Sequence, residues 1–172
     1  MSKNDYITIP LSKRGKNAGK YEVKISLEDA DLSSFNWSVR IGNTLPYAQY
    51  GTPKQYGKKC YYHMHRVILE RMIGRKLKKG EVVDHINHDS LDNRRSNLRV
   101  ATVQQNAQNM RVRSDNTSGY KGVYKSNEKY IAQIWIDESH NYLGYFDTPE
   151  LAHKAYCDAA NEHFGEFANF GN

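Results

Sequence analysis

The segment from residue 82 to residue 110 constrains the fold of this chain more than any other. It begins as an apolar strand that ends in Asp84-His85, a polar stretch follows from 87 to 97, and residues 98 to 100 form a second short strand. Thr102-x-x-Gln105 then has the spacing of a capping box, which predicts a helix that begins near Val103. The pattern therefore predicts two strands, joined by a long polar loop and followed directly by a helix.

Apolar periodicity predicts two amphipathic helices in this region. Val103, Ala107 and Met110 fall at i, i+4 and i+7, so we expect them to pack inward from the helix after the second strand. Upstream, apolar residues recur at helical spacing from Met64 to Ile73, and Gly74 follows as a C-terminal stop.

The chain before residue 63 is rich in Tyr, Gly and Lys. Alternating pieces at residues 21 to 25 and 37 to 41 predict strands broken by Gly and Asn turns. Residues 111 to 118 have no apolar periodicity and are the best candidate for a linker. After the linker, strands are predicted at 120 to 125, 130 to 137 and 142 to 146, followed by a helix from Pro149 to about His163, with Thr148 as its N-cap.

These elements predict an α+β protein with three modules. Residues 1–62 form a basic, β-rich N-terminal element, and residues 63–112 form a strand-strand-helix core with the preceding helix. Residues 113–118 are the linker, and residues 119–172 form a three-stranded antiparallel sheet packed on one helix.

The whole chain has a net charge of +6, and its basic residues concentrate in the first two thirds of the sequence. Residues 1 to 62 contain ten basic and five acidic residues, residues 63 to 113 eleven and five, and residues 114 to 172 four and nine. Such a surplus suits a polyanionic partner but is also common in proteins that have none.

Neither the cysteines nor the N-terminus indicates a secreted or membrane protein. Cys60 and Cys157 are far apart and outside any Cys-x-x-Cys pattern, so no disulfide framework and no cysteine zinc site is expected. The first residues lack the apolar core of a signal peptide, and no run approaches the ~18 apolar residues of a membrane span. We expect a soluble, intracellular protein without a membrane partner.

The segment from Asp84 to Asn106 contains the residue types that hydrolysis of a phosphodiester requires. A base must activate water, and a hard cation held by oxygen ligands must neutralise charge on the phosphate. Asp84 ends one strand, and Asn106 lies one turn into the following helix, so a carboxylate and an amide oxygen could meet. Because neighbouring residues on a strand point to opposite faces, His85 is favoured as a base on the other side of the phosphate.

The stretch VVDHINHDSLDNRRSNLRVATVQQNAQN resembles the HNH nuclease motif, in the form found in phage intron-encoded and free-standing homing endonucleases. The resemblance implies a ββα-metal nuclease core. It implies His85 as general base, Asp84 and Asn106 as ligands of one divalent ion, and Asn97 as the residue that orders the loop through hydrogen bonds. Many family members end the motif in His where this chain has Asn106, which matches an HNN subgroup and favours Mg²⁺ or Mn²⁺.

Other polar residues around the motif have competing interpretations. His65 lies in a stretch that recurs ahead of the motif, and a structural role is favoured for it. A zinc site built from His63, His65, His85 and His88 is a weaker alternative, because the usual paired spacing is missing. Three arginines, Arg94, Arg95 and Arg99, flank the site and are either phosphate contacts, which we favour, or a solvated face.

The C-terminal module resembles the plant Apetala2/ethylene-response-factor DNA-binding domain over nearly its full length, through YKGV, LGYFDTPELAHKAYCDAA and the closing Ala168-Asn169-Phe170. Strand alternation directs Tyr130, Ala132, Ile134 and Ile136 to a face covered by the helix stripe Ala152, Ala155, Tyr156 and Ala159. The resemblance implies that the other face enters the DNA major groove, with contacts from Lys121, Tyr124, Gln133, Trp135 and Tyr142. Several arginines expected on that face are absent and the module is acidic, so a protein-binding or stabilising module is the alternative.

The sequence thus predicts a metal-dependent HNH endonuclease that cuts duplex DNA in the cytoplasm of a phage-infected bacterial host. One site per chain predicts a nick by a monomer, although a dimer is not excluded, and homing as its role follows from the resemblance alone. A catalytically idle DNA-binding regulator and a restriction or host-defence nuclease are the two alternatives.

Overall fold

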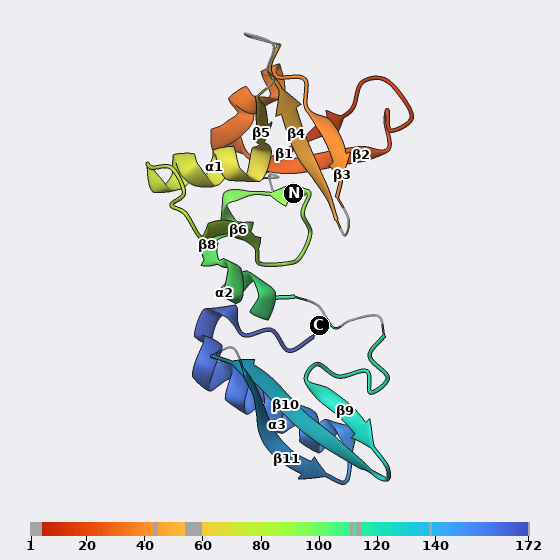
Figure 1. Cartoon of the computed structure of the whole chain (residues 1–172). Coiled ribbons are helices and arrows are strands. Elements are labelled where there is room, and N and C mark those ends of the chain that lie inside the picture. Colours follow the sequence, from red (N-terminus) through yellow and green to blue (C-terminus); the bar gives the residue numbers. More distant parts are fainter. Residues whose placement is uncertain are drawn as a thin grey trace. The chain divides into compact units, whose positions relative to one another are not determined.

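The computed structural model describes residues 5–42, 45–53, 60–110, 112, 115–137 and 139–171, which group into two compact units. The first unit comprises Met1–Ala101 and the second Thr102–Asn172 (Figure 1). The sequence pattern predicts different boundaries, after residue 62 and at residues 113–118. The contacts described below explain the difference. Among the described residues, no helix has the length and apolar character that crossing a membrane requires.

The described residues of the first unit form three small sheets and one α-helix. One sheet has the order β1-β2-β7, with β1 (Tyr6–Leu11) antiparallel and β7 (Asp92–Asn93) parallel to β2 (Tyr21–Ser26). A second has the order β3-β4-β5, formed by β3 (Ser38–Ile41), β4 (Pro46–Gly51) and β5 (Tyr61–His63). The third pairs β6 (Glu81–His85) with β8 (Leu98–Thr102). The helical elements are the 3-10 helix η1 (Leu27–Ser34), α1 (Met64–Ile73) and the 3-10 helix η2 (Arg95–Asn97).

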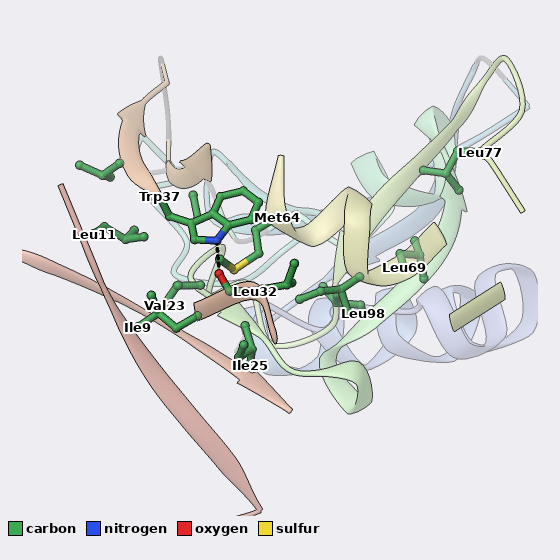
Figure 2. Close-up of a cluster of buried hydrophobic side chains, with 13 residues drawn as sticks. Ile9, Leu11, Val23, Ile25, Leu32, Trp37, Met64, Leu69, Leu77 and Leu98 are labelled. Carbon is green, nitrogen blue, oxygen red and sulfur yellow. Dashed lines mark hydrogen bonds between the residues drawn. The ribbon is translucent and has the colours of Figure 1, made fainter. Parts of the chain in front are cut away.

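One hydrophobic core unites this unit across the boundary predicted after residue 62. Figure 2 shows side chains from the N-terminal strands, such as Ile25, packed with Leu69 of α1 and Leu98 of β8. Trp37 lies in the same core, and its indole Nε1 donates to the carbonyl of Leu32 at 2.7 Å. Because all these side chains leave water together, the N-terminal element and the strand-strand part of the motif stabilise each other.

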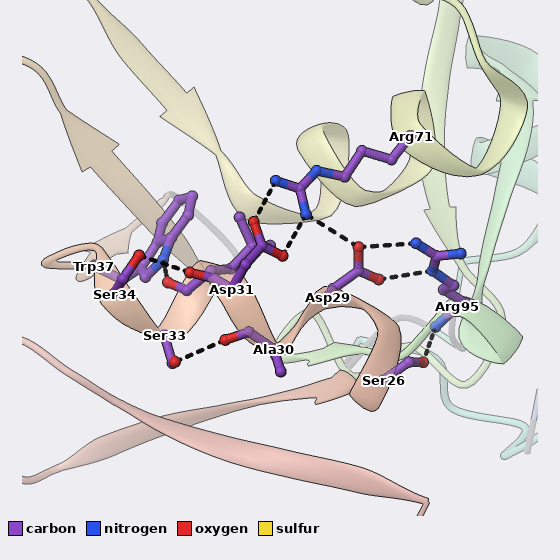
Figure 3. A network of polar contacts seen from close by, with 10 residues as sticks. Ser26, Asp29, Ala30, Asp31, Ser33, Ser34, Trp37, Arg71 and Arg95 are labelled. Atoms are coloured by element: carbon purple, nitrogen blue, oxygen red, sulfur yellow. Dashed lines mark hydrogen bonds and ion pairs between the residues drawn. The ribbon is translucent and has the colours of Figure 1, made fainter.

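A buried carboxylate joins the same parts through ion pairs. Asp29 of η1 is fully buried and accepts hydrogen bonds from Arg95 at 2.7 Å and 3.0 Å, and from Arg71 at 3.4 Å (Figure 3). Arg71 also forms a fork on Asp31, at 2.8 Å to each carboxylate oxygen. The hydroxyl of Ser26 accepts from the Arg95 backbone amide at 2.9 Å. This network connects η1 to α1 and to η2 of the nuclease motif.

The second unit contains the predicted three-stranded antiparallel sheet and its helix. The strands are β9 (Val123–Ser126), β10 (Lys129–Ile136) and β11 (Ser139–Phe146), in the order β11-β10-β9. Helix α3 (Pro149–Phe164) begins at the predicted N-cap, where the Thr148 hydroxyl accepts from the Leu151 amide, and the 3-10 helix η3 (Gly165–Phe167) follows. The core between sheet and helix consists of Val123, Ala132, Ile134, Ala152, Tyr156 and Ala160, so the predicted face assignment is confirmed.

Helix α2 (Val103–Gln108) begins at the predicted capping box, but its predicted inward packing is wrong. The Thr102 hydroxyl accepts from the Gln105 amide at 3.1 Å, and the Gln105 side chain accepts from the Thr102 amide at 2.8 Å. Val103 is 64% exposed, Ala107 is exposed, and Met110, 58% exposed, lies beyond the end of the helix. With only six residues, α2 ends before the i+7 position that would complete an apolar stripe.

Polar contacts near the end of α2 place this helix in the second unit. The Lys121 ammonium donates to the carbonyls of Gln108 at 2.6 Å and Met110 at 2.7 Å. The Asn169 amide donates to the Asn109 carbonyl at 2.8 Å. These bonds bring residues 108–110 to the C-terminal sheet and explain why the unit begins at Thr102.

The predicted linker is structured in the part that the structure describes. Of its residues 113–118, Arg113 and Ser114 lie outside the described residues. The Asn116 side chain donates to the Tyr120 carbonyl at 3.0 Å and accepts from the Gly119 amide at 2.8 Å. Ser118 donates to the Val123 carbonyl at 2.8 Å. Residues 116–119 therefore form a bonded turn that leads into β9.

Candidate active site

Strand β6 delivers Asp84 and His85 to one end of the small β6-β8 sheet. Asp84 is only 3% exposed, and its Oδ2 accepts a hydrogen bond from the Arg99 guanidinium at 2.7 Å. Arg99 comes from β8, the partner strand, so the sheet itself brings the two side chains together. A carboxylate this buried needs charged or polar partners, and Arg99 is one of them.

A buried amide orients the His85 ring. His85 Nε2 lies 2.9 Å from Oδ1 of Asn93, a residue of β7 that is fully buried. An amide oxygen only accepts, so with the Asn93 amide in this orientation Nε2 carries the proton and Nδ1 has the lone pair. Asn93 Nδ2 is also buried and has no hydrogen-bond partner. The site therefore fixes the direction of the ring, and the orientation of the Asn93 amide sets its tautomer.

Burial keeps the histidines around the site neutral. Desolvation lowers the pKa of His85, although the bond to Asn93 and the nearby carboxylates of Asp84, Asp89 and Asp92 act in the opposite direction. The His65 ring lies edge-on to it, with 5.3 Å between ring centroids. Burial first, and then nearby positive charges, lower the pKa of His65 to about 3. A neutral imidazole is the form that can accept a proton from water.

Asn97 closes the loop that separates the two strands. Its Oδ1 accepts from the Asn87 backbone amide at 2.9 Å, and its Nδ2 donates to the Asp92 carbonyl at 2.7 Å. Asn97 is 5% exposed, so water does not compete strongly for these bonds. Further turns come from Asp89, whose carboxylate accepts from the Leu91 amide at 3.0 Å. The loop is thus held by polar side chains, together with Leu91, which packs against the hydrophobic core.

All three arginines proposed as phosphate contacts form ion pairs with buried aspartates. Arg99 pairs with Asp84 as described, and Arg95 forms the fork on Asp29. Arg94 Nε and Nη2 lie 2.8 Å and 2.6 Å from the carboxylate of Asp92, which is 1% exposed. These guanidinium groups therefore have structural partners, and their contact with phosphate stays a prediction.

The metal ligand proposed together with Asp84 belongs to the other unit. Asn106 lies in the middle of α2, half-buried, and the placement of one unit relative to the other is not defined. Within the first unit the structure brings together Asp84, His85 and Asn97. That Asp84 and Asn106 share a cation stays a prediction.

Comparisons with known proteins agree with this geometry. A family model described as HNH endonuclease matches residues 62–108. The chain is 33% identical over 95 residues to Protein 3.8 of Escherichia phage T7, which covers 54% of this chain and 77% of that protein. The chain belongs to the HNH endonuclease family. It is also 39% identical over 106 residues to a protein named as an uncharacterized HNH endonuclease of Acanthamoeba polyphaga mimivirus, where the match covers 61% of this chain.

This HNH chain spans about half the length of its mimivirus relative, 54% of that protein. No solved structure matches it. The family match covers α1, the β6-β8 sheet, the loop between those strands and α2, which together include every residue of the proposed site. The N-terminal strands and the C-terminal sheet lie outside the matched residues.

HNH nucleases generally depend on a divalent metal ion, and the donor chemistry of this chain fits one. Asp84 offers a carboxylate and Asn106 an amide oxygen, which are hard ligands of the kind that Mg²⁺ and Mn²⁺ accept. The alternative zinc site is built from histidines, of which His63, His65 and His85 lie in a row with 5.6 Å and 5.3 Å between successive ring centroids. Across the described ranges, no group of three or more His, Cys, Asp or Glu side chains has a metal-binding arrangement.

The outer face of the C-terminal sheet exposes the aromatic residues proposed to contact DNA. Tyr124, Trp135 and Tyr142 are 50%, 48% and 56% exposed, and Gln133, half-buried, lies opposite Tyr142 in the register. Lys121, proposed for the same contact, instead points to the end of α2, and burial lowers its pKa to about 8. Its use in DNA binding stays a prediction, as does that of the other four.

Asn93 is the residue that sequence reasoning missed. In the sequence it is one of several Asn and Asp residues in a polar loop, which is a common use of these residues in turns. Only the pairing of β7 with β2, which aligns Asn93 with Ile25, fixes its side chain under the His85 ring. A signal for it would have required predicting a parallel pairing with a strand more than sixty residues away.

Proposed function

We propose that this chain is a metal-dependent endonuclease that hydrolyses a phosphodiester bond in duplex DNA and makes a nick. The observation that carries the proposal is the His85 imidazole, which is neutral, oriented by Asn93 and adjacent to the buried Asp84, inside the segment matched by the HNH family. A neutral imidazole held in one tautomer is suited to take a proton from the attacking water.

The roles of the residues follow from their chemistry. His85 Nδ1 accepts the proton of water, while Asn93 holds Nε2 and stabilises the imidazolium that forms. Asp84 and Asn106 would hold one Mg²⁺ or Mn²⁺, which when bound neutralises charge on the phosphate and on the leaving oxygen. Asn97 positions the loop backbone through its two hydrogen bonds and does not touch the reacting atoms.

The exposed aromatic face of the C-terminal sheet supports a second DNA contact. Tyr124, Trp135 and Tyr142 form an exposed surface of a kind that usually binds a partner. In this proposal the Apetala2-like face holds the duplex while the HNH site cuts one strand. A single site per chain makes a nick the simplest product, and homing, in the cytoplasm of a phage-infected bacterium, is the proposed role.

Relaxation of supercoiled plasmid tests the proposal. Wild type, His85→Ala and Asn97→Ala are compared with Mg²⁺, with Mn²⁺ and with EDTA. We expect open circles from the wild type with either metal, none in EDTA, and a loss of at least ~100-fold in His85→Ala, because general base catalysis contributes ~10²–10⁴-fold. Equal nicking by wild type and His85→Ala would mean that His85 is not the base. Duplex binding in EDTA without nicking under any metal would instead favour the idle DNA-binding regulator.

A further inference from the structure

Among the described residues of the first unit, the loop between β1 and β2 contains the densest group of basic side chains that form no salt bridge. This basic loop, residues 12–20, is the red-orange loop that connects the two strands in Figure 1. Its four basic residues are all exposed: Lys13, Arg14, Lys16 and Lys20. No acidic residue occurs within the loop, where the sequence reads SKRGKNAGK.

The basic side chains of the loop and the arginines of the nuclease motif differ in whether they form ion pairs. Among the residues that the structure describes, none of the four forms a salt bridge, whereas Arg94, Arg95 and Arg99 each pair with a buried aspartate. Moving a motif arginine onto a phosphate would break its ion pair with a buried carboxylate, which is strongly destabilising. A phosphate that meets the basic loop displaces only water and counterions.

The basic loop has a defined base and tight turns. The Ser12 amide donates to the Trp37 carbonyl at 3.0 Å, and the Ser12 hydroxyl accepts from the Val39 amide at 3.0 Å. Gly15 and Gly19 have φ values of +82° and +70°, which only glycine adopts without strain. The basic side chains are thus presented from a short, anchored connection.

The sheet sets the distance from the basic loop to the candidate active site. Strand β2 leads from the loop to Ile25, which is aligned with Asn93, the residue that bonds His85. Lys20 precedes Ile25 by five residues, which corresponds to about 17 Å along an extended strand. The rise of duplex DNA is 3.4 Å per base pair, so this distance spans roughly five base pairs.

We infer that the basic loop binds backbone phosphates of duplex DNA about five or more base pairs from the bond that His85 attacks. The inference rests on the proposed function, since it assumes a DNA substrate. In this inference the N-terminal element contributes non-specific affinity for DNA and fixes the position of the protein along the duplex. The ion-paired arginines of the motif then have a structural role. Contacts of this kind hold the duplex without reading its sequence.

The test compares two variants of equal net charge. Lys13→Gln/Lys16→Gln removes two charges from the basic loop. The control Lys125→Gln/Lys154→Gln removes two exposed lysines of the second unit that lie away from the face with Tyr124 and Trp135. Anisotropy of a fluorescein-labelled 40-bp duplex is measured in EDTA between 50 and 200 mM salt, so that cleavage plays no part. Thermal unfolding checks that both variants stay folded, as expected for exposed side chains.

We expect the loop variant to lose about 10-fold or more in affinity at 100 mM salt, and its plot of log K against log salt to become shallower by about 2, since each phosphate contact contributes roughly 0.9. The control should change the slope by less than 1. Equal behaviour of the two variants, or a loss confined to single-stranded DNA, would overturn the role of the basic loop and leave the nuclease proposal intact. Failure of the wild type to bind any duplex would overturn both.

A second measurement tests where on the DNA the basic loop contacts phosphates. Ethylation of individual phosphates in a nicked target should interfere with wild-type binding about five or more base pairs from the nick, on one side. This signal should disappear in Lys13→Gln/Lys16→Gln and persist in the control. Interference that is identical in all three proteins would contradict the inference.

Discussion

Replacing Asp29 by Asn should destabilise the first unit by about 2–3 kcal/mol. The carboxylate is fully buried and has Arg95 at 2.7 Å and 3.0 Å and Arg71 at 3.4 Å. Removing one partner of a buried ion pair typically costs ~3–5 kcal/mol, because the remaining charge has lost its counterion. Here the side chains of Arg95 and Arg71 are 34% and 37% exposed, so water screens part of that loss, and the expected cost lies at or just below the lower end of this range.

Urea unfolding followed by circular dichroism measures this loss. With a slope of ~1–3 kcal/mol per molar urea, the midpoint for the first unit should fall by about 0.7–3 M. Asp31→Asn is the matched control, since Asp31 also pairs with Arg71 but is 57% exposed, and such a pair contributes about 0–1 kcal/mol. If Asp29→Asn lost no more than Asp31→Asn, the argument that a buried carboxylate joins the N-terminal element to the nuclease motif would be wrong.

Three further predictions concern the site, the second unit and pH. Asn93→Ala should slow nicking by about 10–100-fold while His85 stays in place, because loss of an orienting partner typically has that effect; plasmid relaxation measures it, and an unchanged rate would remove Asn93 from the mechanism. Gly122→Ala should cost about 2–5 kcal/mol in thermal unfolding, because φ is +72° and an added Cβ would lie 2.1 Å from a tyrosine ring carbon, whereas Gly119→Ala, with φ +77° and open space, should cost about 1–2 kcal/mol. Burial lowers the pKa of His65 to about 3, so the unfolded chain binds this proton more readily than the folded protein. The free energy of unfolding should therefore fall as the pH drops from 6.5 towards 3. Urea titrations at several pH values should show a weaker pH dependence of this free energy in His65→Asn.

Local patterns predicted most of the secondary structure. The helix predicted at residues 64–73 is α1, and the predicted strands and helix of the C-terminal module are β9, β10, β11 and α3, because each has a clear period and a strong stop or cap. The strands predicted at 21–25 and 37–41 correspond to β2 and β3. The inward packing of α2 was wrong, because spacing alone does not reveal that the helix ends after six residues.

The unit boundaries depended on long-range contacts that periodicity does not contain. The N-terminal strands share a core with α1 and β8, so residue 62 does not separate two hydrophobic cores. At the other end, Lys121 and Asn169 bond the backbone after α2, which assigns that helix to the second unit. The family match, residues 62–108, includes residues of both units, because it extends past the unit boundary between Ala101 and Thr102. A sequence motif and a folding unit are therefore different divisions of this chain.

The arginines show why charge was harder to interpret than periodicity. Arg95 and Arg99 stand beside a catalytic motif, and proximity in the sequence favoured contact with phosphate. Their partners, however, are Asp29, 66 residues away, and Asp84, 15 residues away, and both carboxylates are buried. A buried carboxylate requires a counterion whether or not DNA is present, so these guanidinium groups form ion pairs within the folded protein. Exposed cations without such a partner are available to a phosphate. Among the described residues of the first unit, four of them lie together in the basic loop, on the same sheet as the residue that orients His85.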